Sequence, residues 1–300
     1  MIRLAYYPGC TLKDQAKGFE DSAHLVAGAL GLELVELQRW TCCGTVHSLA
    51  TDDVMHQLAP IRNLLRAQEM KGEGLVDDDR LVTLCAMCYN TLKRANSVFQ
   101  EDEERREKIV EIMTKEEHQY QGRVKVVHLL EVLRELGWQR VREAVKKPLE
   151  GLRVAPYYGC LLLRPRGVGL DDTDNPTIME NMVQALGGEV VDFPYKQKCC
   201  GSYQTVHMPE TVSELAHRIL SQAQEMGAEL LVTACPLCEY NLGRMQDRIA
   251  RRHPGFQPIP VIYFTQLMAL AFGLGPGEAG FSPNTPDPTP LLEERGLLEG

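Results

Sequence analysis

Two regular patterns of apolar and polar positions run along the chain: short apolar runs and longer amphipathic stretches. In the first half, four short runs have the composition of buried strands: residues 4–7, 32–37, 80–85 and 124–127. Residues 19–30 carry apolar side chains at helical spacing, and Gly31 follows them as a helix stop. A further helix is expected between Cys43 and residue 70, with Pro60 kinking or splitting it. The first half therefore predicts alternating strands and helices.

The second half repeats this plan. Three apolar runs are expected to be strands, at residues 189–193, 229–234 and 260–264. A helix is expected to begin at Asn175-Pro176 and to end at Gly187. Thr211 and Glu214 predict a capping box for the helix that follows. Strands and helices that alternate at these lengths are typical of parallel sheets covered by helices, one sheet in each half.

The cysteines repeat in the same order in both halves. Each half holds a lone cysteine, then Cys-Cys-Gly, then Cys-x-x-Cys, at Cys10, Cys42, Cys43, Cys85, Cys88, Cys160, Cys199, Cys200, Cys235 and Cys238. The flanking segments also match, LAYYPGC with VAPYYGC and LVTLCAMC with LVTACPLC. A repeat of this length indicates an internal duplication. We therefore expect an α/β fold of two pseudo-twofold-related, Rossmann-like domains with parallel sheets, each carrying one cysteine-rich site where its strands end.

Domain boundaries follow from the same repeat. We expect the N-terminal domain to span residues 1–150 and the C-terminal domain residues 151–273. Residues 274–300 are rich in Pro, Gly and acidic side chains, which predicts a flexible tail.

Composition limits where the protein works. There are 41 Asp and Glu against 32 Lys and Arg, a net charge of −9, which argues against a broad nucleic-acid surface. The apolar stretch at residues 261–275 is shorter than the roughly 20 residues that a spanning helix needs. The N-terminus lacks the build of a secretory signal. These features predict a cytoplasmic protein without a membrane span.

Four kinds of chemistry could account for the ten cysteines. Disulfides are disfavoured because the cytoplasm keeps thiols reduced and a chain of this size does not need them. A thioredoxin-like redox pair at either Cys-x-x-Cys explains only four of the ten residues. Zinc in one half remains an alternative, although five thiols are one more than a closed tetrahedral site takes. Iron–sulfur clusters are favoured, because thiolates are soft ligands and adjacent cysteines can reach different irons of one cluster.

Other residues near the cysteines are weaker candidates. Gly44 and Gly201 are expected to adopt positive φ angles that free backbone N–H groups for sulfur. His47 could deliver a proton to a leaving thiolate, although a lone His in a loop is more often structural. Trp40 is expected to shield a cluster from water. A basic set could bind the acidic groups of a thiol substrate or serve only solubility or a partner contact: Arg164, Arg166, Lys196 and Lys198.

The doubled cysteine order and the stretches YYPGC, WTCCG, YYGCLLLRPRGV and HLLEVL resemble the CCG-domain proteins, and within them the B subunit of heterodisulfide reductase. The resemblance extends over nearly the whole chain to about residue 272. It implies that each half binds one noncubane 4Fe–4S cluster through its five cysteines. In that family the substrate disulfide lies between the two clusters and is split in one-electron steps.

The resemblance also implies partners. Electrons would arrive from a small ferredoxin-like subunit, which a flavin-containing subunit of the same complex feeds. The expected function is therefore that of the catalytic iron–sulfur subunit of a heterodisulfide-reductase-like complex. The alternative is a CCG-type electron-transfer subunit of a quinone-linked or other dehydrogenase complex, without disulfide chemistry.

Overall fold

A computed structural model describes residues 1–45, 53–282 and 284–298. It contains two four-stranded sheets, and every strand pair in them is parallel. The first sheet has the order β2-β1-β3-β4, with β1 Ile2–Tyr7, β2 Leu32–Glu36, β3 Arg80–Thr83 and β4 Lys125–His128. The second has the order β6-β5-β7-β8, with β5 Arg153–Tyr157, β6 Glu189–Val190, β7 Leu230–Thr233 and β8 Val261–Tyr263. The two sheets share one topology, which confirms the predicted pair of similar α/β domains.

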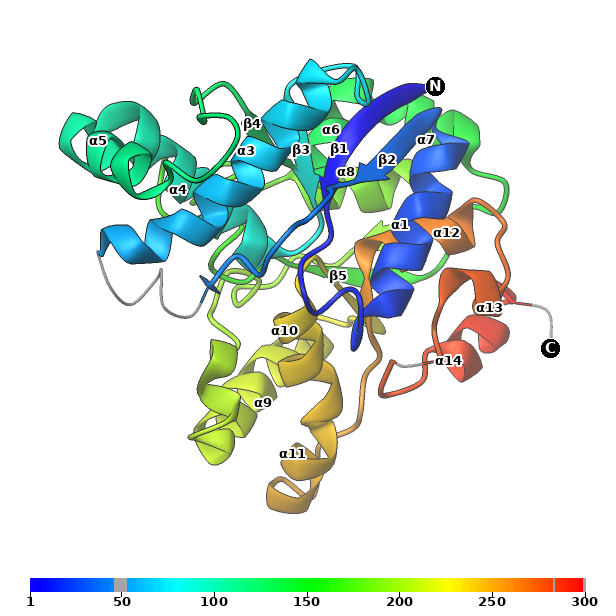
Figure 1. Ribbon diagram of the computed structural model, residues 1–300. Helices are drawn as coiled ribbons and strands as arrows, with labels where there is room; N and C mark the ends of the chain where they lie inside the picture. The colour runs from blue at the N-terminus through cyan, green and yellow to red at the C-terminus, as the bar shows by residue number, and fades with distance from the viewer. Residues whose placement is uncertain (46–52, 283, 299–300) are drawn as a thin grey trace.

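Helices cover both sheets (Figure 1). In the first half they are α1 Lys17–Ala29, α3 Leu58–Gly72, α4 Ala86–Glu101, α5 Glu103–Ile112, α6 Leu129–Leu136 and α7 Trp138–Ala144. In the second half they are α8 Ile178–Ala185, α9 Pro209–Glu225, α10 Pro236–Glu239, α11 Gln246–Arg252, α12 Phe264–Ala271, α13 Pro276–Ala279 and α14 Thr289–Glu294. Short turns of other helix types lie at η1 Val54–Gln57, η2 Ser202–Thr205 and η3 Tyr240–Arg244. No helix in the described ranges is long and apolar enough to cross a membrane.

The two domains pack together through equivalent helices. Helix α1 lies against α12, where the rings of Phe19 and Tyr263 stack 4.2 Å apart and the hydroxyls of Ser22 and Thr265 are hydrogen-bonded at 2.7 Å. Helix α8 lies against α6 in the same way. Since α1 and α8 follow the first strand of each repeat and α6 and α12 follow the last, the interface is pseudo-twofold. The sites of the two domains are thereby fixed relative to one another.

Three local expectations differ from the structure. Pro60 lies in the first turn of α3, where its missing N–H costs no hydrogen bond, and η1 precedes it. Helix α8 begins at Ile178 rather than at Asn175-Pro176, because the Asp171 carboxylate accepts hydrogen bonds from the N–H groups of Thr177 and Ile178, each at 2.7 Å. The capping box predicted from Thr211 and Glu214 does not start α9. This helix begins at Pro209, a residue that suits the first helical position, and no side chain caps it.

The segment expected to be a flexible tail is instead largely folded. It contains α13, which lies against α1 and α12, and α14 (Figure 1). Phe281 and Leu292 are buried, and the Gln266 Nε2 amide donates to the Gly280 carbonyl oxygen at 2.7 Å and to the Asn284 Oδ1 atom at 2.8 Å. The Pro-rich composition indicated a loose segment, but its large apolar side chains are buried and α13 packs against a helix of each domain.

Candidate functional site

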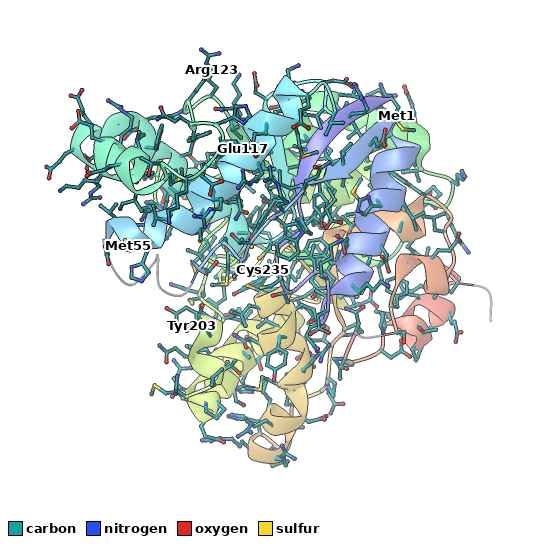
Figure 2. All side chains as sticks on the ribbon, in the orientation of Figure 1. Met1, Met55, Glu117, Arg123, Tyr203 and Cys235 are labelled. Carbon is teal, nitrogen blue, oxygen red and sulfur yellow. The ribbon has the colours of Figure 1, made fainter. Side chains whose placement is uncertain are left out.

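The ten cysteines lie where the strands end, as the sequence predicts. In each half the lone cysteine follows the first strand, and the Cys-x-x-Cys begins the helix after the third strand. The carboxyl ends of parallel strands meet at one edge of a sheet, so these thiols converge. All ten are free thiols. Cys235 lies near the centre of the molecule (Figure 2).

The first set of thiols forms one continuous group. The Sγ atoms of Cys10 and Cys42 are 3.9 Å apart, and those of Cys43 and Cys88 are 3.5 Å apart. Cys85 is the N-cap residue of α4, one turn before Cys88. Cys10 and Cys42 are exposed and the other three are buried, so the group extends from the surface into the core.

The second set repeats this arrangement. The Sγ atoms of Cys200 and Cys238 are 3.6 Å apart, and the nearby Cys199 thiol raises the pKa of Cys160. The Gly201 N–H donates to the Cys199 sulfur at 3.4 Å, with Gly201 at a φ of 97° as predicted, and the corresponding Gly44 has a φ of 72°. The Cys160 thiol and this N–H lower the pKa of Cys199 to about 6.

The two sets meet across the domain interface. The Cys85 thiol lies close enough to Cys235 for Cys235 to lower the pKa of Cys85, and the Ala86 N–H donates to the Ala234 carbonyl oxygen at 3.2 Å. Met87 and Leu237 occupy the same position in each Cys-x-x-Cys, and both side chains line both cysteine cavities. Two like thiol sites thus face one another, separated by a pair of apolar side chains.

The donor set fits soft-metal chemistry. Each half brings five unbonded thiols to one place, and the Asn241 Nδ2 amide lies 3.4 Å from the Cys200 sulfur. Thiolates favour iron–sulfur assemblies or zinc over harder ions, and nearby N–H donors tune such groups. The residues present are therefore suited to hold iron–sulfur clusters.

A tyrosine anchors each Cys-Cys-Gly loop. The Tyr7 hydroxyl donates to the Thr41 carbonyl oxygen at 2.8 Å, and the Tyr157 hydroxyl donates to the Lys198 carbonyl oxygen at 2.6 Å. Both tyrosines are buried at the end of the first strand of their domain. The matched segments YYPGC and PYYGC both contain this tyrosine, but only the fold shows that its hydroxyl holds the Cys-Cys-Gly loop.

Glycine allows close approach beside the thiols. A Cβ atom at Gly9 would lie 3.1 Å from the Cys88 sulfur, and one at Gly159 would lie 3.3 Å from the Cys238 sulfur. Both glycines have positive φ angles, 71° and 64°. A side chain here would therefore crowd the thiols as well as strain the backbone.

The cavities beside the two thiol sets differ in volume. The first thiol set opens into a cavity of about 410 Å³ that reaches across the interface to Tyr203, Glu239 and Arg244. The second set borders a cavity of only about 20 Å³. Leu161 lines this smaller cavity, and the Asn90 Nδ2 amide holds its segment by donating to the carbonyl oxygens of Leu161 and Arg164 at 2.9 and 2.6 Å. Of these two cavities, the one beside the first set has room for a ligand of moderate size.

The far wall of the larger cavity carries polar groups that the sequence analysis missed. Burial raises the pKa of Glu239 to about 7, and the Tyr263 hydroxyl donates to its Oε2 atom at 3.3 Å. The Arg244 Nε atom is buried without a hydrogen-bond partner in the described part of the chain. Both residues follow the second Cys-x-x-Cys closely, but only the domain interface turns them toward the first thiol set.

A buried histidine was also missed. His128 Nδ1 accepts from the Leu130 N–H at 3.2 Å, so the Nε2–H donates to the Leu84 carbonyl oxygen at 2.8 Å. Complete burial lowers the pKa of His128 to about 4. Because Leu84 precedes Cys85, this neutral histidine positions the start of the first Cys-x-x-Cys.

The four basic residues predicted to bind a substrate lie outside both cysteine cavities. Lys196 is bound by Glu180 and Asp192, each at 2.8 Å, and Arg166 pairs with Asp174 at 2.6 Å. Arg164 lines an open surface groove beside Asn90 and Arg94. The Lys198 ammonium lies 6.0 Å from the centre of the Tyr195 ring. Among the described residues, these four side chains line neither cysteine cavity.

Two further predictions concern the first Cys-Cys-Gly. Trp40 is partly buried, with its ring edge-on to Tyr7 at 6.0 Å and its Nε1–H donating to Glu36 at 3.0 Å. It therefore supports the tyrosine that holds the loop. His47 lies outside the described residues.

Comparison with known proteins agrees with this geometry. The cysteine-rich domain called CCG matches residues 4–93 and 154–243. The 8-methylmenaquinol:fumarate reductase membrane anchor subunit of Wolinella succinogenes is 32% identical over 96% of this chain and 98% of its own length. The B subunit of the ferredoxin/F(420)H(2)-dependent CoB-CoM heterodisulfide reductase of Methanosarcina acetivorans is 29% identical over 95% of this chain and 94% of its own.

A solved structure shares the fold. A hypothetical protein from Helicobacter pylori superposes with a TM-score of 0.72 and 14% identity, covering 94% of this chain, which spans about half (51%) of that structure. The doubled domain match, the relatives and the paired thiol sites agree: the chain belongs to the CCG cysteine-rich domain family.

Proposed function

We propose that this chain is the catalytic iron–sulfur subunit of a heterodisulfide-reductase-like complex in the cytoplasm, where it reduces a disulfide between two cysteine-bound clusters. One observation carries the proposal. The two five-thiol sets lie at the domain interface, and the side chains of Met87 and Leu237 line both of their cavities. Two equivalent redox sites facing one another suit a substrate with two sulfurs that takes up two electrons.

Each set would hold one noncubane 4Fe–4S cluster. The first would be bound by Cys10, Cys42, Cys43, Cys85 and Cys88, and the second by Cys160, Cys199, Cys200, Cys235 and Cys238. When bound, such clusters supply electrons one at a time. A ferredoxin-like subunit, fed by a flavin-containing subunit of the same complex, is the proposed source of these electrons.

The chain's own residues bind the substrate and hold protons. The cavity beside the first thiol set offers Tyr203 and Tyr240 as an aromatic wall and Arg244 as a cation. Reduction of one disulfide to two thiols takes up two electrons and two protons. With a pKa of about 7, the Glu239 carboxyl holds a proton near neutral pH within this cavity.

A second candidate function rests on a specific comparison. The Wolinella relative, at 32% identity over nearly the whole chain, is named as the membrane anchor of a quinol:fumarate reductase. On this alternative, the chain passes electrons between the partner proteins of a quinone-linked complex, and the thiol sites act as a relay without disulfide chemistry.

Assays of the complex, purified without oxygen, distinguish the two functions. We expect turnover of a disulfide in a panel of low-molecular-weight and protein-bound disulfides. Cys200→Ala should abolish this turnover, whereas Arg164→Ala should change it by less than about tenfold, because an exposed charge contributes about 1 kcal/mol. Electron exchange with a quinone but with no disulfide would favour the relay. Equal losses in the two variants, with iron content intact, would favour charge-based substrate capture.

A further inference from the structure

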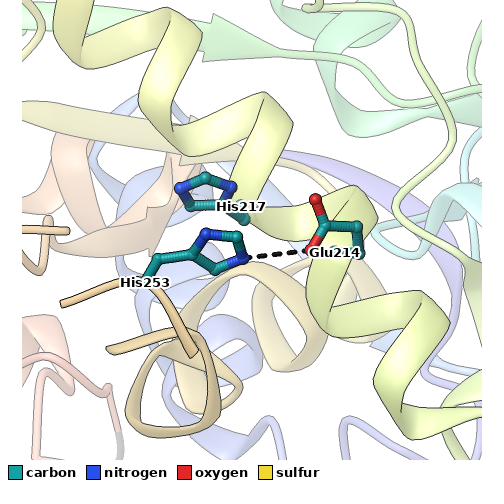
Figure 3. A group of neighbouring side chains, drawn as sticks. All are labelled: Glu214, His217 and His253. Atoms are coloured by element: carbon teal, nitrogen blue, oxygen red, sulfur yellow. Dashed lines mark hydrogen bonds and ion pairs between the residues drawn. The ribbon is translucent and has the colours of Figure 1, made fainter. Parts of the chain in front are cut away.

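A group of three metal-binding side chains lies apart from the cysteines, in the lobe formed by α9 and α11 (Figure 3). Glu214 and His217 are three residues apart on α9, and His253 follows the end of α11. Their ligand atoms all lie within 4.8 Å of one another. All three side chains are partly exposed, so an ion from solvent can reach them.

The packing of the two helices holds the three residues in place. Val212, Ala216 and Ile219 bury the opposite face of α9, and Ile249 of α11 is buried as well. The His253 Nε2 atom lies 3.0 Å from the Glu214 Oε2 atom, and the imidazole rings of His217 and His253 stack with their centres 3.6 Å apart. Phe256 contacts the His217 ring edge-on at 5.7 Å. The packing of α9 and α11 therefore brings the three side chains together.

The chemistry of the group points to one class of ion. Two imidazoles and one carboxylate are nitrogen and oxygen donors of the kind that Zn²⁺ and neighbouring divalent transition metals take. Zinc binds such donors at about 2.0–2.2 Å, which places its ligands roughly 3.5 Å apart. For a zinc ion to bind, the ligand atoms must therefore approach one another by about 1 Å, and one imidazole ring must turn out of the stack. The other carboxylate oxygen, Glu214 Oε1, is 3.8 Å from Arg218, which leaves Oε2 for the metal.

We propose that Glu214, His217 and His253 form a divalent transition-metal site, with water as a further ligand, that links α9 to α11. The site has no thiol ligand, so it is separate from the cysteine groups and does not depend on the proposed reaction. Its ion would fasten the end of α11 to α9, the helix that follows the second Cys-Cys-Gly.

Calorimetric titration with Zn²⁺ tests the site in the cluster-loaded protein under anaerobic conditions. We expect one saturable site that releases protons on binding and raises the unfolding temperature. His217→Ala, His253→Ala and Glu214→Gln should each weaken binding by at least about tenfold, since even outer-sphere changes cost 10–100-fold in affinity. Glu214→Gln can still hydrogen-bond to His253, so it tests ligation with the packing kept.

His207→Ala is the matched control, because His207 is an exposed histidine just before α9 and outside the group. Its zinc affinity should equal that of the wild type. Iron is measured after each titration to show that zinc has not displaced it. Equal zinc binding by wild type and all three site variants, or zinc uptake only with loss of iron, would overturn the proposal.

Discussion

At the scale of single residues, the structure gives the tyrosine before each lone cysteine a definite task. The hydroxyls of Tyr7 and Tyr157 hold equivalent Cys-Cys-Gly loops by hydrogen bonds to backbone carbonyls. We expect Tyr157→Phe to lower stability by about 1 kcal/mol and to lower iron content toward half, because the loop carrying Cys199 and Cys200 loses its anchor. Iron analysis and denaturant unfolding measure both effects.

Tyr158→Phe provides the comparison. Tyr158 is equally buried, but its hydroxyl is bonded to Glu180 instead of the loop. This variant should keep its iron. Full iron content in Tyr157→Phe, or equal iron loss in both variants, would contradict the assigned role.

His128 makes a residue-scale prediction about pH. Its pKa is about 4 in the folded protein and near 6.5 when unfolded. Between these values the unfolded state binds more protons, so the free energy of unfolding falls as the pH is lowered, by about 3 kcal/mol in total from this group. In His128→Asn, which keeps an N-cap acceptor for α6, this part of the pH dependence should be absent.

Denaturant unfolding at several values between about pH 7 and about pH 5 checks this difference. The variant is expected to be less stable at neutral pH, because the Leu84 carbonyl loses its donor, and to show the flatter profile. Parallel profiles for variant and wild type would mean that His128 does not carry the effect.

At the scale of helices and strands, the C-terminal segment is a structural part of the domain interface. Helix α13 packs against α1 and α12, and Phe281, which follows α13, is buried. Phe281→Ala should therefore lower the free energy of unfolding by about 3–5 kcal/mol. Glu293→Ala, on the exposed side of α14, should change it by less than about 0.5 kcal/mol. Denaturant unfolding that shows similar small effects for both would indicate a segment that does not stabilise the fold.

The elements also show how far the sequence could be interpreted. The strands, their parallel pairing and the placement of the thiols followed from apolar runs and the cysteine repeat, because both patterns are local. The start of α8 could not be predicted, since its N–H groups are satisfied by Asp171, a residue outside the helix. The folded C-terminal segment was missed because the surface that α13 contacts, made by α1 and α12, exists only after the two domains associate.

At the scale of the whole molecule, duplication explains the site and its asymmetry. The pseudo-twofold interface brings Cys85 and Cys235 together, yet the cavity beside the first thiol set measures about 410 Å³ and the one beside the second only about 20 Å³. The sequence predicted two equivalent thiol sets, but it could not show that Arg244 and Glu239 of one domain line the cavity of the other. The basic set around Arg164 and Lys196 stays a prediction, and Asp and Glu partners already bind two of its members.

The central claim is that both thiol sets bind iron–sulfur clusters. Iron, sulfide and zinc analysis of anaerobically purified protein tests it most directly, with the His253→Ala variant used so that the α9–α11 site contributes no zinc. We predict about eight irons and about eight sulfides per chain, with no stoichiometric zinc. About four irons together with one zinc, or iron bound without sulfide, would contradict the claim.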